Sequence, residues 1–302
     1  MDQNINFKSY FKKANIFSLV LFVCSVLLMI FKGLNYGIDF KGGTLIELRI
    51  TDQNIEIKEV RSSFKKFVEG DLSVKEFGKK GDYLIKIEKT SLANKNYIQE
   101  LKVNINKVLN GQANFRRIEN VGPKVSSELL ESGLLAIGLS LAAMLFYIWI
   151  RFEWQFSVGA IVALFHDISI TIGIFSLLSF EINLSIIAAV LTIVGYSMND
   201  TVVIYDRIRE NLFKYNKIDI NEISNLSINE TLSRTIITSV TTLLALLSIF
   251  FLGGEILKGF SFAMILGVII GTFSSIFVAA PILKLFKVSY KTMEKNEEQI
   301  VP

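Results

Sequence analysis

Two aspartates lie in long apolar segments, where a charged side chain is energetically unfavourable. Asp200 lies within the apolar segment of residues 182–205, and Asp167 follows His166 near the middle of residues 157–178. A carboxylate at the centre of a bilayer costs about 2.5–3.5 kcal/mol on insertion scales. Such residues face the protein interior and mark ion or proton pathways. Asp200 is therefore the first candidate for a proton-exchanging group.

Polar residues accompany Asp200 on its predicted helix. Tyr196 and Ser197 precede it by four and three residues, so these side chains share one helical face. Asn199 and Thr201 lie directly beside it in the sequence. A polar face at this depth favours a hydrated cavity over contact with lipid.

Arg234 directly precedes the next apolar segment, residues 235–252. It begins a helical face that continues through Thr238, Thr241, Ala245 and Ser248. Two interpretations are open. Arg234 can extend to the membrane surface, as arginines at helix ends usually do. It can also turn inward and pair with Asp200, which would keep that carboxylate ionised until a proton competes.

His166 and Asp167 have less certain chemistry. A lone histidine is usually structural, and we interpret His166 in that way. Asp167 has two interpretations of equal weight. It is either a permanently protonated residue that bonds a neighbouring helix, or a member of the proton pathway, since no water is available at that depth to solvate it.

A row of small residues marks the last apolar segment. Ala263, Gly267, Gly271 and Ser275 recur at every fourth position. Such spacing allows a second helix to approach closely. The sequence therefore predicts a packing seam, either within the chain or against a partner subunit.

The elements that position these residues are transmembrane helices. The chain has 302 residues, of which 51% are hydrophobic and 20% charged. Apolar runs near twenty residues predict membrane-spanning helices. We predict a first span at residues 14–31 after an N-terminal segment of residues 1–13, and five further spans within a bundle of residues 133–286. These five are residues 133–150, 157–178, 182–205, 235–252 and 260–286. Residues 287–302 form a tail.

The short connections place lysine and arginine on one side of the membrane. This bias predicts that both termini are cytoplasmic. The long segment of residues 32–132 is then extracytoplasmic, since long loops cross the membrane regardless of charge. The single cysteine, Cys24, excludes an intrachain disulfide. The net charge of +4 gives no indication of nucleic-acid binding.

Residues 32–132 predict a small α+β domain. Strands are expected at residues 44–51, 73–77, 83–88 and 114–121, and amphipathic helices at residues 57–68 and 97–109. The order βαββαβ is the ferredoxin-like pattern. The glycine-rich run at residues 37–44 predicts a turn that leads into the sheet. A phosphate-binding loop is a poor alternative, because the glycines precede a strand instead of a helix.

Nearly the whole chain resembles the SecF family, the smaller membrane subunits of SecDF protein-export complexes within the resistance–nodulation–division superfamily. The resemblance rests on the glycine-rich run, on His166-Asp167, and on the segments of residues 194–203, 206–211 and 229–235. By motif position, the proton-path carboxylate of the family corresponds to Asp200 and its membrane arginine to Arg234. Some members of the family fuse SecD and SecF, and the resemblance implies the form that is separate from SecD.

The resemblance implies a multi-pass protein of the bacterial cytoplasmic membrane. Its implied partners are SecD, the Sec channel with other translocase subunits, exported unfolded polypeptides and membrane lipid. It implies no enzyme activity and no cofactor, with the proton as coupling ion. Sodium is an alternative, because a carboxylate with nearby hydroxyl groups can bind either ion.

Two other functions compete with this interpretation. A small-molecule efflux transporter of the same superfamily would also use membrane carboxylates, but such pumps usually have twelve spans and two large external loops. A non-catalytic scaffold for SecD is the second alternative. An intramembrane hydrolase is disfavoured, because the spans lack a Gly-x-Ser-x-Gly or His-Glu-x-x-His motif.

Overall fold

The computed structural model describes residues 5–52, 55–68, 72–76, 79–87, 95–215, 217–290 and 292. It divides into two compact units. The sheet unit comprises residues 35–135 together with residues 181–184, and the helical unit comprises the remaining chain. The predicted domain of residues 32–132 therefore matches most of the sheet unit. The sequence did not predict that residues 181–184 also belong to it, because the last three of them fall within the predicted span of residues 182–205.

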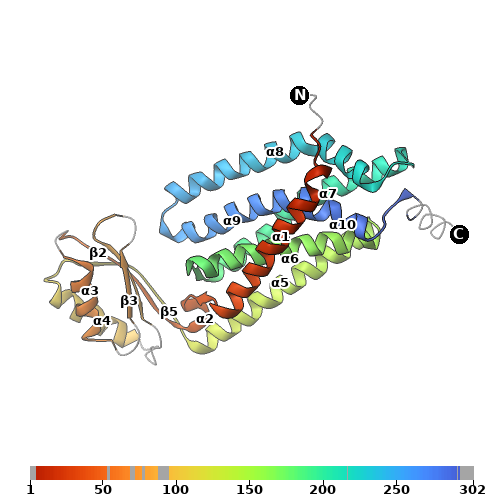
Figure 1. Ribbon diagram of the computed structural model, residues 1–302. Coiled ribbons are helices and arrows are strands. Elements are labelled where there is room, and N and C mark those ends of the chain that lie inside the picture. Colours follow the sequence, from red (N-terminus) through yellow and green to blue (C-terminus); the bar gives the residue numbers. More distant parts are fainter. Residues whose placement is uncertain are drawn as a thin grey trace. The chain divides into compact units, whose positions relative to one another are not determined.

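The sheet unit has the predicted βαββαβ order (Figure 1). Its strands are β2 (Gly43–Ile50), β3 (Leu72–Glu76), β4 (Asp82–Ile87) and β5 (Ala113–Val121). The strand order is β3-β4-β2-β5, with every pair antiparallel. Helices α3 (Ile57–Lys65) and α4 (Lys95–Val108) supply the helical layer. The predicted strand ends at Phe77 and Glu88 lie outside the described residues.

One face of this sheet is apolar and the other is charged. Alternate residues of β2 and β4, such as Ile46 and Ile85, are buried with Phe64 of α3 in a common core. On the opposite face, Arg49 donates two hydrogen bonds to Asp82, at 2.6 and 2.8 Å. Alternation with period two thus explains both the core and the solvated face. Arg117 bonds Glu119, and this hydrogen bond raises the pKa of the guanidinium.

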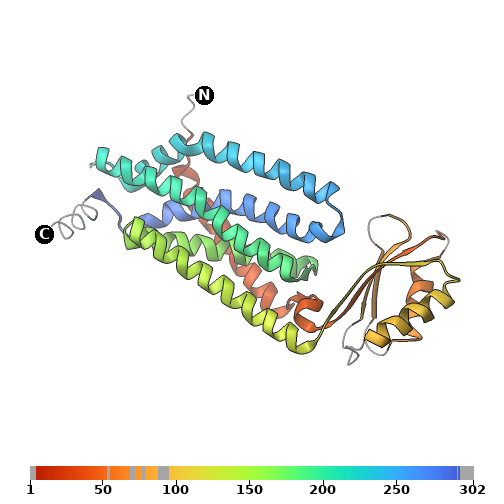
Figure 2. The ribbon, with the colours of Figure 1, turned by 180° about the vertical axis from the view of Figure 1, so that it is seen from behind.

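Within the residues that the structure describes, six helical stretches are long and apolar enough to cross a membrane. The first is α1 (Lys8–Phe31), and the next four are α5 (Pro123–Arg151), α6 (Trp154–Leu178), α7 (Leu184–Lys214) and α8 (Ile220–Leu252). The sixth consists of α9 (Glu255–Ser274), a π-helical turn η1 (Ser275–Ala279) and α10 (Ala280–Leu285). Figure 2 shows these helices from behind. Several extend beyond the predicted spans into polar sequence; α8, for example, begins at Ile220 with Asp219 as its cap.

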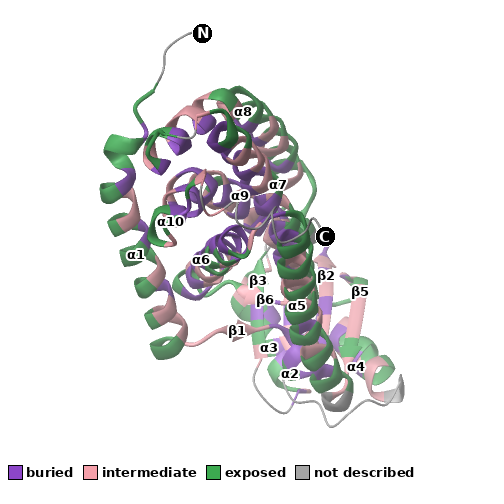
Figure 3. Cartoon of the chain, turned by 90° about the vertical axis from the view of Figure 1, so that its right-hand side faces the viewer, coloured by how far each residue is buried: buried purple, intermediate pink, exposed green. Residues whose placement is uncertain are grey.

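Three helices form the centre of the helical unit. Each helix contains an apolar stretch of 18 residues. About half of that stretch is buried in α6 (50%), α7 (50%) and the α9–α10 stretch (56%), whereas the buried share is 11% in α1 and α5 and 17% in α8. Figure 3 shows the corresponding concentration of buried residues. Asp167 and Asp200 lie on central helices, so the protein surrounds both. The outer helices instead present apolar surface that lipid or another subunit can cover.

Ion pairs join α5 to α7 and α7 to α8, near the connections that are rich in lysine and arginine. Arg151 at the end of α5 pairs with Asp206 of α7 at 3.0 Å. Arg207 bonds Glu230 of α8 at 2.7 Å. The residues predicted to face the cytoplasm thus meet at one end of the helical unit. The tail beyond residue 292 lies outside the described residues.

The glycine-rich run forms more than the predicted turn. Residues Asn35–Tyr36 form the short strand β1, which pairs in parallel with β6 (Glu181–Ile182). A single helical turn, α2 (Ile38–Lys41), follows. Gly42 and Gly43 then adopt φ angles of 77° and 137°, which only glycine adopts readily. These two glycines allow the chain to enter β2 directly.

Candidate functional site

Asp167 lies where three helices meet. It is 0% exposed. Ser197 of α7 and Ser274 of α9 donate hydrogen bonds to its Oδ2, at 2.6 and 2.7 Å. His166 Nδ1 lies 2.8 Å from its Oδ1. This single carboxyl group therefore joins α6, α7 and α9, and the position of each helix depends on its charge and geometry.

The π-helical turn begins directly after Ser274. Such turns occur mostly as single-turn insertions in helices, often at functional sites. Ser275, the first residue of η1, bonds the carbonyl of Thr272 in its own helix at 3.0 Å. The two adjacent serines thus have different roles, because Ser274 bonds across to α6 and Ser275 bonds within its own helix.

Asp200 is buried without a hydrogen-bond partner for its Oδ2 among the described residues. The residue is 3% exposed. The hydroxyl groups of Tyr196 on α7 and Thr235 on α8 are likewise buried without a described partner. A buried carboxylate oxygen that no protein group satisfies is costly in its charged form. Protonation removes the charge and so lowers that cost, which makes Asp200 a candidate for a proton-exchanging group.

The structure does not form the predicted ion pair between Arg234 and Asp200. Arg234 is exposed on α8 and pairs with none of the described carboxylates, although it is near enough to act electrostatically on Asp200. The adjacent Thr235 is the buried residue instead. Consecutive helical residues point about 100° apart, so α8 directs one of the two inward and the other outward.

The other polar residues that the sequence singled out lie partly in the interior near Asp167 and Asp200 and partly at the surface. Ser197 bonds Asp167, and Thr201 donates to the carbonyl of Ser197 at 3.2 Å. Thr238 bonds only carbonyl groups of its own helix. Asn199 is exposed. Ser197 is therefore bonded to a buried carboxylate, whereas Thr201 bonds the backbone of its own helix and Asn199 is exposed.

Sequence reasoning missed Ser274 and Thr235. Each is a hydroxyl in an apolar span, which is a weak signal because such hydroxyls usually bond the preceding turn of their own helix. Ser274 does so as well, at the carbonyl of Gly271. Its second contact, with Asp167, depends on how α6 and α9 pack.

The predicted small-residue seam lies against α7. A Cβ atom at Gly267 would lie 2.3 Å from Ile193 Cγ1, and one at Gly271 would lie 2.9 Å from Ser197 Cβ. Ala263 is fully buried. The glycines thus let α9 approach the part of α7 that includes Ser197. This approach places Ser197 and Ser274 at the same carboxylate.

Replacing Gly271 by alanine is expected to destabilise the protein by about 1–3 kcal/mol, because the added methyl group overpacks a close helix contact. The measurement is thermal unfolding of the purified protein in detergent. Gly138→Ala is the matched control, since Gly138 is exposed on α5 with nothing within 4 Å of its Cβ position. That control should be neutral or slightly stabilising, because alanine is the better helix former. Equal effects at the two glycines would contradict the seam.

Comparison with known proteins identifies the family. The family model "Protein export membrane protein SecD/SecF, C-terminal" matches residues 101–289, and the "SecD/SecF GG Motif" model matches residues 27–53. The protein translocase subunit SecF of Rickettsia rickettsii is 43% identical over 297 residues, covering 97% of this chain and 96% of that protein. The chain belongs to the SecF family. SecF of Cereibacter sphaeroides is 42% identical over 276 residues, covering 88% and 85%.

Solved structures of SecDF have the same fold as this SecF-family chain. SecDF from Thermus thermophilus, described as a translocon-associated membrane protein, matches with a TM-score of 0.83 and 34% identity over 95% of this chain. SecDF in a super-membrane-facing form matches with a TM-score of 0.71 and 34% identity over 98% of it. The chain spans about two fifths of those SecDF chains, 39% and 40%. It is thus a multi-pass, non-enzymatic protein translocase subunit, and the efflux alternative has no support.

Proposed function

We propose that this chain acts with SecD in the Sec protein-export machinery and uses the proton gradient to promote late steps of translocation across the bacterial cytoplasmic membrane. Both termini are cytoplasmic and the sheet unit is extracytoplasmic in this proposal. The observation that supports proton coupling best is Asp200, a buried carboxylate on a central membrane helix with an oxygen that no described group satisfies. Such a residue is an ion or proton site by default.

The proposed proton step changes the charge of a buried group and therefore the packing around it. A proton that enters from outside neutralises Asp200, and its release inward restores the charge. Moving one charge through 100 mV supplies about 2.3 kcal/mol. Ser197 lies one turn before Asp200 and bonds Asp167. A displacement of α7 at Asp200 therefore reaches the contact of α6, α7 and α9.

A partner subunit completes the pathway in this proposal. Arg234, Thr241 and Ser248 are exposed along α8, in a helix long and apolar enough to span the membrane. Polar and cationic side chains are unfavourable against hydrocarbon and pack against protein or line aqueous cavities. The names of the SecDF structures and their greater length support SecD as that partner. Exported polypeptides and the remaining translocase subunits are the other proposed partners.

Arg234 gives a test that separates proton coupling from a scaffold function. Arg234→Gln removes the cation near Asp200, whereas Arg234→Lys keeps the charge. We expect the glutamine variant to lose most of the protonophore-sensitive component of preprotein export, and the lysine variant to retain part of it. The measurement uses membranes in which the variant is the only copy of the protein, with copurification of SecD as the check on assembly.

The matched control is Lys217→Gln, which removes an exposed cation between α7 and α8. It should leave the export response unchanged. A wild-type response in Arg234→Gln would instead favour the scaffold, with all proton chemistry in SecD. Repeating the assay with the sodium and proton gradients dissipated separately identifies the coupling ion.

A further inference from the structure

We propose that Asp39 is a positioning residue that fastens the start of α7, the helix with Asp200, to the sheet unit. This inference rests on the proposed proton-coupled function. It assigns a role to the glycine-rich motif. The motif residues and residues 181–184, which include β6 and the first residue of α7, belong to the same compact unit, although they are far apart in the sequence.

Backbone pairing provides the first part of this connection. Asn35 and Tyr36 of β1 lie opposite Glu181 and Ile182 of β6 in a parallel pair. Gly37 N–H extends the pairing by donating to the carbonyl of Ile182 at 2.8 Å. Gly37 is also confined, since a Cβ atom there would lie 3.3 Å from that of Asn183. β1 and Gly37 thus hold β6 through main-chain contacts.

Asp39 provides the second part, at the first residue of α7. Its Oδ2 accepts a hydrogen bond from the backbone N–H of Leu184 at 2.9 Å. The first N–H groups of a helix have no partner within the helix, and a carboxylate there interacts favourably with the helix dipole. Asp39 therefore caps α7 from a distant segment of the chain, and α7 begins at a point that the motif defines.

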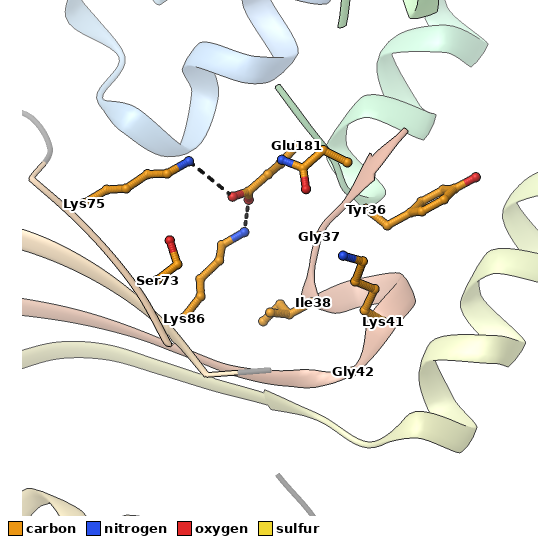
Figure 4. Close-up of a pocket in the computed structure, with 10 residues that line it drawn as sticks. Tyr36, Gly37, Ile38, Lys41, Gly42, Ser73, Lys75, Lys86 and Glu181 are labelled. Carbon is orange, nitrogen blue, oxygen red and sulfur yellow. Dashed lines mark ion pairs between the residues drawn. The ribbon is translucent and has the colours of Figure 1, made fainter. Parts of the chain in front are cut away.

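Charged side chains attach β6 to the sheet itself. Glu181 forms ion pairs with Lys86 of β4 and, at 3.8 Å, with Lys75 of β3 (Figure 4). Figure 4 shows these side chains around a small cavity that Gly37, Ile38 and Gly42 also line. β6 is thus joined to the motif by its backbone and to the four-stranded sheet by its side chain.

The connection matters because α7 holds both Ser197 and Asp200. α6, which contains Asp167, ends two residues before β6, and α7 begins one residue after it. Any displacement of α6 or α7 along its axis must therefore act on residues that are built into the sheet unit. We infer that this connection, residues 179–183, transmits proton-driven movement of α7 to the sheet unit, and that Asp39 keeps it fastened.

The test compares Asp39→Ala with Asp39→Asn. Alanine removes the acceptor for Leu184 N–H, whereas asparagine keeps an acceptor oxygen in the same place. We expect Asp39→Ala to increase amide hydrogen exchange in residues 180–186 by about fivefold, as the loss of a helix cap does. It should also lose the protonophore-sensitive part of export, while protonophore-insensitive export and SecD copurification stay normal. Asp39→Asn should restore both properties.

Asp219→Ala is the matched control. Asp219 caps α8 by accepting from Asn221 N–H at 3.0 Å, and it lies in the helical unit. We expect faster exchange near residue 221 with a normal export response. An equal loss of response in Asp219→Ala, or wild-type exchange or export in Asp39→Ala, overturns the positioning role. If Asp200→Asn keeps its response, the proposed proton function fails instead, and the exchange result for Asp39 is unaffected.

Discussion

Asp200→Asn is expected to abolish the dependence of preprotein export on the proton gradient while the complex with SecD still assembles. Asparagine has nearly the same size but cannot exchange a proton. We expect the protonophore-sensitive rate to fall by about tenfold or more, the change that about 1.4 kcal/mol in a barrier produces. The burial of Asp200 means that the neutral amide is tolerated at least as well as the charged group. The measurement is export in membranes with and without a protonophore.

Asp206→Asn provides the control on the same helix. Asp206 lies at the end of the helical unit and pairs with Arg151, with both side chains nearly half exposed. Exposed pairs contribute little to stability, so this variant should export normally. A full proton response in Asp200→Asn would make Asp200 a structural residue and would place the proton chemistry in a partner subunit.

Asp167→Ala should lower the free energy of unfolding by about 3–5 kcal/mol. The substitution removes one member of a buried hydrogen-bonded group and leaves the hydroxyls of Ser197 and Ser274 without their acceptor. The three central helices lose their shared contact at the same time. Thermal unfolding in detergent, or the yield of assembled complex, measures the loss.

Asp167→Asn separates the two interpretations of this residue. The amide oxygen can still accept from both serines, so most of the stability should return. If Asp167 belongs to the proton pathway, the asparagine variant assembles but responds weakly to the proton gradient. A stable variant with a normal response shows that Asp167 serves only to hold α6, α7 and α9 together.

Periodic patterns allowed the main elements to be predicted. The strands and helices of the sheet unit show alternation or a helical apolar stripe, and their order gave the ferredoxin-like arrangement that the structure has. The six apolar spans were equally clear. By contrast, β1 and β6 have two residues each and no pattern. Their pairing depends on tertiary contacts between distant segments, so the sequence could not predict it.

The candidate site was predictable as residue types but not as contacts. The cost of charge in an apolar span singled out Asp167 and Asp200, and both are buried on central helices. The partners depend on helix rotation, which one sequence does not determine. The sequence left open whether Arg234 points toward Asp200 or outward; in the structure Arg234 is exposed and Thr235 is the buried neighbour. For the same reason the contact of Ser274 with Asp167 could not be anticipated.

The pairing of β1 with β6 has a consequence for biosynthesis. The four-stranded sheet is complete in the chain once residue 121 has been made, whereas β6 is synthesised only after α6. The ribosome must therefore produce two further membrane helices before β1 finds its neighbour and Leu184 finds Asp39. A fragment that ends at residue 135 would contain the sheet and its core but would leave β1 as an open edge. The sheet unit is thus finished last, at the residues that lead into α7.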